Sequence, residues 1–153
     1  QGPNTPYQIA MASGVAPSEM DSMRLARHRP DVEKRFEAIL ETCPRGVNLS
    51  AELRAQLGML KHRTVPMHPE KPAPTLTTLP DDILHYRDPR ILTVREYARI
   101  QSFPDWFRFK GKYTTGGASR RHECPRYTQV GNAVPPLLGQ AIGSGLMACL
   151  SLS

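Results

Sequence analysis

The most constraining feature of the sequence is its uncharged end: no Asp, Glu, Lys or Arg follows Arg126. Within this stretch, apolar and small side chains recur at helical spacing, at Leu137, Leu138, Ala141, Ile142, Gly145, Leu146 and Cys149. This pattern predicts a final helix that buries nearly all of one side. A membrane span is less favoured, because Pro135, Pro136 and Gln140 interrupt the stretch and no basic residue flanks its far side.

Composition narrows the class of protein. The 153 residues fit one compact domain, and 15 prolines and 11 glycines indicate helices joined by long loops. A net charge of +6 favours an anionic partner without identifying it. Cys43, Cys124 and Cys149 form no C-x-x-C pair, which argues against a disulfide framework or a zinc finger and for a reducing, intracellular setting. The start at Gln1 lacks an initiator methionine and a signal peptide, so we expect a processed product or an excerpt of a longer protein.

The first half of the chain predicts several short elements. We expect an irregular arm over residues 1–16 and a short helix over 18–28. A stronger helix opens at Pro30, and a third is capped by Ser50 and continues to Leu60. The β-prone run at 75–78 predicts a strand among loops.

The second half predicts a scaffold helix followed by a basic loop. Thr93 and Glu96 fit a capping box, which starts a helix with Val94, Tyr97 and Ala98 facing inward. For Arg95 we expect an internal ion pair or backbone contacts rather than a catalytic role, with Glu96 or Asp105 as the acidic partner. Aromatic residues at 106, 107 and 109 form an anchor, and residues 110–126 read as an exposed basic loop.

Two stretches carry a resemblance to a known family. Residues 90–109 read R-I-L-T-V-R-E-Y-A-R-I-Q-S-F-P-D-W-F-R-F, and residues 127–143 read Y-T-Q-V-G-N-A-V-P-P-L-L-G-Q-A-I-G. In this order they resemble the ninth and tenth signature motifs of the DNA (cytosine-5) methyltransferases, and residues 62–78 look like the lead-in to the first of them. The earlier residues are more loosely similar to the variable recognition region of bacterial members.

The resemblance implies a helix-rich α+β fragment of a Rossmann-like, S-adenosylmethionine-dependent methyltransferase. Residues 1–88 would end the target-recognition region, and residues 89–126 would hold the scaffold helix, aromatic anchor and basic loop. Residues 127–153 would complete the cofactor domain. Such a protein would work on double-stranded DNA in the cytoplasm of a bacterium, without a membrane.

The resemblance also implies that this chain lacks the catalytic groups. In the family a cysteine thiolate attacks C6 of a flipped cytosine, a glutamate assists at N3, and C5 takes the methyl group. The matching Pro-Cys loop, Glu-Asn-Val strand end and glycine-rich turn are absent from the sequence. An N-terminal catalytic segment or a separate catalytic subunit would have to supply them, and this chain alone would methylate nothing and bind the cofactor poorly.

The candidate binding residues follow from the same comparison. Gly131, Asn132, Ala133 and Val134 match the family's turn against the methionine end of S-adenosylmethionine, although Asn132 could instead only cap the last helix. Residues 63–70 are a candidate for reading bases. Basic residues proposed to contact phosphates are Arg24, Arg27, Arg29, Lys61, Arg63, Arg120, Arg121 and Arg126.

Three further expectations remain. The spacing of the histidines gives no ligand pair, so no metal site is expected. The chain could be a separately made subunit or an excised domain of a single-chain enzyme, and the missing methionine favours the second. A non-catalytic DNA-binding or regulatory module is the alternative from another functional class. In each case the apolar last helix predicts self-association of the isolated chain.

Overall fold

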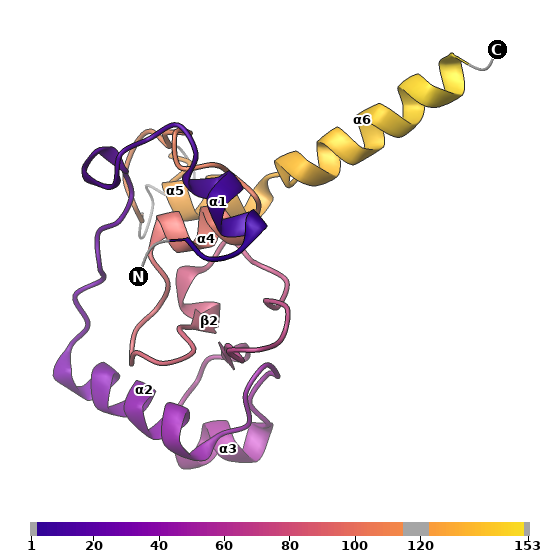
Figure 1. Ribbon diagram of the computed structural model, residues 1–153. Helices are drawn as coiled ribbons and strands as arrows, with labels where there is room; N and C mark the ends of the chain where they lie inside the picture. Colours follow the sequence, from indigo (N-terminus) through magenta and orange to yellow (C-terminus); the bar gives the residue numbers. More distant parts are fainter. Residues whose placement is uncertain (1–2, 115–122, 152–153) are drawn as a thin grey trace. The chain divides into compact units, whose positions relative to one another are not determined.

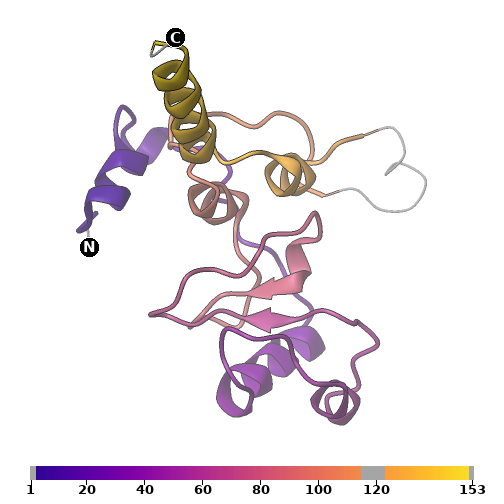
Figure 2. The same cartoon turned by 90° about the vertical axis from the view of Figure 1, so that its right-hand side faces the viewer.

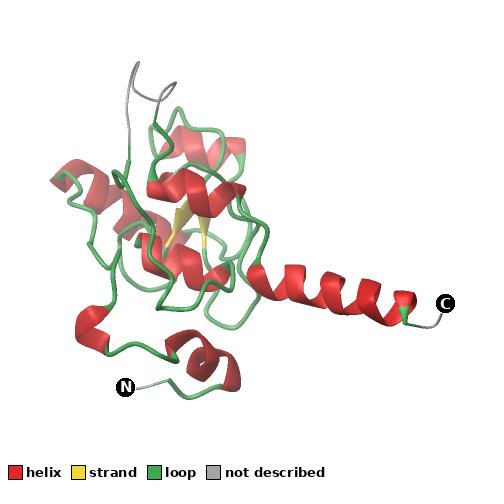
Figure 3. Ribbon diagram, turned by 90° about the horizontal axis from the view of Figure 1, so that it is seen from above, coloured by secondary structure: helices red, strands yellow, loops and turns green. Residues whose placement is uncertain are grey.

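The computed structural model describes residues 3–114 and 123–151 (Figure 1). Its regular structure is mostly helical, with one small sheet (Figure 3), as expected for a helix-rich α+β chain. The chain divides into two compact units, Gln1–Met23 with Val94–Ser153 and Arg24–Thr93. These units do not coincide with the three consecutive segments expected from the sequence, because the chain leaves the first unit and later returns to it.

The helices of the second unit begin where the sequence predicts. Helix α2, Pro30–Thr42, starts with proline in its first turn and buries Phe36 and Ile39. Helix α3, Ala51–Gln56, is capped by Ser50, whose hydroxyl accepts from the Leu53 N–H at 3.3 Å. The continuation of α3 to Leu60 is wrong, because Gly58 turns left-handed with φ 62° and Leu60 is 98% exposed.

The sheet of the second unit lies elsewhere than predicted. Strand β1, Val65–Pro66, pairs in parallel with β2, Ile83–Leu84, as the two arrows in Figure 2 show. The strand expected over residues 75–78 is wrong. There the Thr77 hydroxyl donates to Asp82 at 2.7 Å and accepts from the Leu79 N–H, which favours a turn leading into the short 3₁₀ helix η2, Pro80–Asp82.

The N-terminal part of the first unit is more ordered than its composition suggested. Helix α1 spans Pro6–Ala12 and begins with a capping box between Thr5 and Gln8. The irregular arm predicted over residues 1–16 is therefore wrong for this stretch. The helix predicted over 18–28 is also wrong: only η1, Pro17–Glu19, forms, and Ser22 is buried in the left-handed region with φ 63°.

Helix α4, Val94–Ile100, forms the centre of the first unit. It starts directly after Thr93 and fully buries Val94, Tyr97 and Ala98, as predicted. Beyond it, the rings of Phe103, Phe107 and Phe109 lie 4.9 to 5.2 Å apart between centroids. Phe103 and Phe109 are buried, whereas Phe107 is 36% exposed. Trp106 is 57% exposed, and its ring centroid lies 6.1 Å from that of Phe107.

The chain ends in two helices, α5, Arg126–Asn132, and α6, Pro136–Leu150. Residues 137–150 of α6 are all exposed, so the described residues leave uncovered the apolar side that the sequence predicts to be buried. By length and composition alone, the stretch Arg126–Leu150 could cross a membrane, but residues 133–135 interrupt its helix.

Candidate functional site

The turn between α5 and α6 holds the residues proposed to meet the cofactor. Asn132 is the last residue of α5 and is exposed, and Ala133 follows as its cap, donating its N–H to the Val130 carbonyl at 3.2 Å. We expected Asn132 at the start of the last helix, and this is wrong: Pro135 occupies the N-cap position of α6. The reason is local, because a residue preceding proline disfavours the helical conformation.

Helix α5 is fixed to α4 by aromatic and apolar contacts. The rings of Tyr97 and Tyr127 meet edge to face, with centroids 5.6 Å apart. Val130, on the next turn of α5, is fully buried. The start of the turn is therefore attached to the rigid centre of the first unit.

Arg95 joins three segments of the first unit. Its side chain is fully buried, and its guanidinium pairs with Asp21 while Asp105 lies 4.0 Å away. It also donates to the carbonyls of Asp21 at 3.2 Å, Pro104 at 3.1 Å and Phe107 at 2.7 Å. Arg95 thus has a structural setting in which Asp21, rather than Glu96, is the principal acidic partner.

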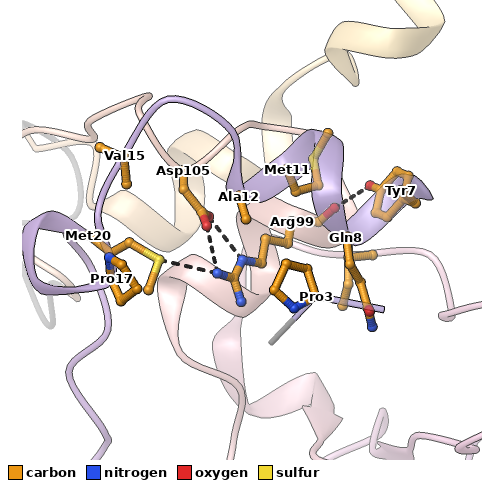
Figure 4. A pocket seen from close by; sticks show the side chains of 11 residues that line it. Pro3, Tyr7, Gln8, Met11, Ala12, Val15, Pro17, Met20, Arg99 and Asp105 are labelled. Atoms are coloured by element: carbon orange, nitrogen blue, oxygen red, sulfur yellow. Dashed lines mark hydrogen bonds and ion pairs between the residues drawn. The ribbon is translucent and has the colours of Figure 1, made fainter. Parts of the chain in front are cut away.

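A second arginine of α4 pairs with Asp105 beside a cavity. Arg99 donates to the Asp105 carboxylate at 2.9 and 2.6 Å, and this pairing raises the pKa of Arg99 above its ordinary value. The cavity has a volume of about 590 Å³ and is lined mainly by apolar side chains of the N-terminal segment, including Met11 and Met20 (Figure 4). Because the Arg99 guanidinium is already paired, the cavity presents mostly apolar surface.

The basic residues proposed to contact DNA have different surroundings. Arg24 and Arg27 are exposed on a segment without regular structure. Arg63 donates to the Thr75 carbonyl at 3.1 Å and lies 4.0 Å from Asp82, so part of its hydrogen-bonding capacity is used internally. Arg120 and Arg121 lie outside the described residues.

The other phosphate candidates are paired within the chain. Lys61 lies 2.6 Å from Asp81 and 2.7 Å from Asp82, and Arg29 lies 3.0 Å from Asp31. Arg126 donates to the Gly111 carbonyl and to the Ser22 hydroxyl and lies 3.6 Å from Asp21. Of these, Arg126 is the most constrained, because it supports the same Asp21 that pairs with Arg95.

The segment proposed to read bases is only partly accessible. Thr64, Val65 and Pro66 are buried, and the last two form strand β1. Their side chains are unavailable to a DNA groove, which corrects this part of the prediction. Pro69 and Glu70 are exposed, and for them base contact remains a prediction.

The cysteines and histidines do not assemble a reactive or metal-binding cluster in residues 3–114 and 123–151. Cys43 is buried next to the end of α2, whereas Cys124 and Cys149 are exposed. Within this range no group of three or more His, Cys, Asp or Glu side chains could hold a metal ion.

The sequence did not predict the roles of two residues of the first unit, Asp21 and Ser102. Asp21 was placed in a helix that does not form, so its pairing with Arg95 was overlooked. Ser102 stood only as a letter within the first motif, yet it is buried with φ 60° and its hydroxyl accepts from the Leu137 N–H at 3.1 Å. The sequence carried no local signal for this conformation, because glycine or asparagine usually occupies the left-handed position after a helix.

Known proteins similar to this chain are DNA methyltransferases. "Type II methyltransferase M.DdeI" of Desulfomicrobium norvegicum is 47% identical over 76 residues, 49% of this chain and 18% of its own length. "DNA (cytosine-5)-methyltransferase 1" of the mouse is 44% identical over 68 residues, 44% of this chain and 4% of its own length. "Type II methyltransferase M.AquIB" of Picosynechococcus is 38% identical over 82 residues, 52% of this chain and 59% of its own length.

These alignments cover about half of the chain, and the chain spans less than a fifth of the first of these relatives. The family profile reaches further. A profile described as C-5 cytosine-specific DNA methylase matches residues 19–148, which include α4, the turn after α5 and most of α6. Because this profile covers most of the chain, the chain belongs to the C-5 cytosine-specific DNA methylase family.

Proposed function

We propose that this chain is the C-terminal part of a DNA (cytosine-5) methyltransferase. It would provide the end of the DNA-recognition region and close an S-adenosylmethionine site on a Rossmann-like sheet located in another segment. The observation that carries the proposal is the exposed turn ending in Val134, followed by a helix whose apolar side is uncovered.

The exposed side of α6 supports docking to such a sheet. Its large apolar side chains are between 46% and 70% exposed, at Leu137, Leu138, Ile142, Leu146, Met147 and Leu150. Burying such side chains is favourable by about 1.5–3 kcal/mol each. A helix without charged residues and with this much exposed apolar surface has the properties of an element completed by a partner surface.

The residues of the turn can form hydrogen bonds with the polar methionine end of S-adenosylmethionine. The Asn132 side chain is exposed and makes no hydrogen bond to the described residues, so its amide can donate and accept. The N-terminus of α6 offers less than expected, because Pro135 and Pro136 lack N–H groups and the Leu137 N–H is already bound to Ser102. We therefore assign recognition of the methionine carboxylate or amine to Asn132 and the neighbouring backbone of Gly131 and Ala133.

Catalysis would depend on another segment. A reactive thiolate requires an accessible and electropositive setting with a proton carrier nearby. Cys43 is buried, and Cys149 projects from the uncharged helix α6. Cys124 is exposed, but it precedes a proline instead of following one as in the family's Pro-Cys loop. We infer that the nucleophile is supplied by a segment upstream or by a separate subunit, and that this chain is inactive alone.

Both ways of supplying that segment remain open. The 82 matched residues make up 59% of the Picosynechococcus relative, so that methyltransferase chain is itself shorter than this one. This favours the separate-subunit version more than the sequence alone did, whereas the small share of the Desulfomicrobium relative fits an excised domain. In either version we expect the enzyme to act on double-stranded DNA in the cytoplasm.

The test is complementation. We expect this chain mixed with its upstream catalytic segment to transfer labelled methyl groups from S-adenosylmethionine to DNA, while neither part does so alone. Asn132→Ala should weaken cofactor binding in the mixture without changing its DNA affinity. Transfer by the catalytic segment alone at the full rate would overturn the proposal.

A non-catalytic DNA-binding module is the second candidate, favoured by the exposed Arg24 and Arg27. DNA binding by the chain, without any catalytic segment encoded next to it, would support this candidate. The presence of Pro-Cys, Glu-Asn-Val and a glycine-rich turn in the adjacent upstream reading frame would exclude it.

A further inference from the structure

The α5–α6 turn is held at both ends by two consecutive residues from the end of α4. On one side, the Gln101 side-chain amide donates to the Val130 carbonyl at 3.3 Å. On the other side, the Ser102 hydroxyl accepts from the Leu137 N–H at 3.1 Å. The connection from the end of α5 to the start of α6, residues 131–136, is therefore attached at both its entry and its exit to the same point of the scaffold.

Ser102 adopts a backbone conformation that would suit glycine better. It ends α4 with φ 60°, its own N–H donates to the Arg99 carbonyl at 3.0 Å, and the Phe103 N–H donates to the Ala98 carbonyl at 2.9 Å. This is the hydrogen-bond pattern of a Schellman motif, in which glycine usually occupies the left-handed position. A serine in this conformation is strained. Because the Ser102 side chain is buried and its hydroxyl is hydrogen-bonded, the strain indicates that the hydroxyl has a role.

The hydroxyl supplies a cap that α6 cannot provide for itself. The first N–H groups of a helix lack partners within it, and an N-cap side chain usually satisfies one of them. Pro135 makes no such hydrogen bond, and neither Pro135 nor Pro136 has an N–H. Leu137 carries the first N–H of α6, and Ser102 accepts it from another element.

We propose that Gln101 and Ser102 are positioning residues for the cofactor-contacting turn. Together they fix where α5 stops and α6 starts, and so set the position of Asn132 without contacting the cofactor themselves. This inference rests on the proposed function of the turn. A turn held in place before binding loses less conformational freedom when the ligand arrives, which raises affinity.

The test compares variants of Ser102 in the complete methyltransferase. Ser102→Gly keeps the left-handed backbone and removes the hydroxyl, whereas Ser102→Asn tolerates that backbone and restores a side-chain acceptor. We expect Ser102→Gly to raise the Kd and KM for S-adenosylmethionine about 3- to 10-fold, the effect of one hydrogen bond, with KM for DNA unchanged. Ser102→Asn should recover at least part of the affinity, and Gln101→Met should resemble Ser102→Gly.

Thr5→Gly is the matched control, because it removes the side-chain cap of another helix of the same unit, α1. Hydrogen exchange of the amides of residues 131–134 and of Leu137 adds a readout that does not need activity. It should quicken in Ser102→Gly and Gln101→Met but not in Thr5→Gly. Equal losses of melting temperature and of all kinetic constants in Ser102→Gly and Thr5→Gly, or unchanged cofactor affinity in Ser102→Gly, would overturn the inference.

Failure of the proposed function has a separate signature. If Asn132→Ala leaves cofactor affinity unchanged, the turn does not contact the cofactor and the proposed function is wrong at this site. If Asn132→Ala lowers the affinity for the cofactor and Ser102→Gly does not, only the positioning role of Gln101 and Ser102 is wrong.

Discussion

At the scale of single residues, buried charge organises the first unit. Arg95 has a fully buried side chain, which makes hydrogen bonds to carbonyls from two segments and an ion pair with Asp21, whose side chain is 19% exposed. The five N–H donors of a guanidinium suit this task, and a lysine could not reproduce it. Removing the Arg95 guanidinium should destabilise the first unit, because the carbonyl oxygens and the Asp21 carboxylate would lose their hydrogen-bond donor.

We therefore expect Arg95→Met to lower the free energy of unfolding by about 3–5 kcal/mol, measured by urea denaturation of the whole chain. Arg108→Ala is the control: Arg108 is exposed, and its single hydrogen bond, to the Glu19 carbonyl, is 3.5 Å long. It should change the free energy by no more than about 0.5 kcal/mol. Similar small losses in both variants would contradict the structural role of Arg95.

His28 makes the second unit sensitive to pH. Its Nε2 accepts from the Ile91 N–H at 3.3 Å, which requires an unprotonated nitrogen, and its ring meets Phe36 edge to face. Burial lowers the pKa of His28, while nearby Glu33 acts in the opposite direction. The folded chain thus binds this proton less readily than the unfolded chain.

The sign of the effect on stability follows from linkage. The contribution of His28 is complete above the ordinary histidine pKa of about 6.5 and is lost as pH falls toward the lowered pKa. We expect His28→Gln to reduce the slope of unfolding free energy against pH in that window. His62→Gln, at an exposed position, should leave the slope unchanged, and an unaltered slope in His28→Gln would refute the assignment.

At the scale of elements, α6 differs from helices α2 and α4 in leaving its apolar side chains exposed. Helices α2 and α4 each bury side chains within their unit, whereas residues 137–150 are exposed throughout. Its large apolar side chains at 138, 142 and 146 fall at successive i+4 positions and share one side of the helix.

This side should cause the isolated chain to self-associate. We expect light scattering to show oligomers that dissociate in the double variant Ile142→Gln with Leu146→Gln. Ser144→Gln changes the opposite side of the same helix and should leave the oligomers intact. A monomeric parent chain, or the same oligomeric state in both variants, would show that the apolar side of α6 does not mediate self-association.

At the scale of the whole molecule, the two parts of the first unit are separated in the sequence by a continuous segment that has its own core. Residues 24–93 form one compact unit with a parallel strand pair and two helices. The unit buries its own apolar side chains, including Ile39, Leu49, Val65, Ile83 and Leu84. A segment that completes its own core does not need the flanking chain for stability.

We accordingly expect residues 24–93, produced alone, to fold cooperatively and give dispersed amide resonances. Ile39→Ala should destabilise this unit by about 2–5 kcal/mol, because Ile39 is fully buried. Val47→Ala, at a position that is 53% exposed, serves as the control. Collapsed amide resonances in the parent segment would show that the unit depends on the rest of the chain.

The sequence alone determined the family, the helices that start at Pro30, Ala51 and Val94, and the uncharged final helix. Local signals specify these features, because capping residues and apolar spacing act over a few neighbouring positions. The motif letters likewise located the turn ending in Val134, although the helix boundary within it was misplaced by the effect of Pro135.

Tertiary structure alone decided which distant groups meet. The pairing of Asp21 with Arg95 and of β1 with β2 depends on chain segments far apart in sequence, which local periodicity cannot identify. The left-handed conformation of Ser102 and the use of its hydroxyl by α6 have the same origin, since packing of α4 against α5 outweighs the local preference for glycine.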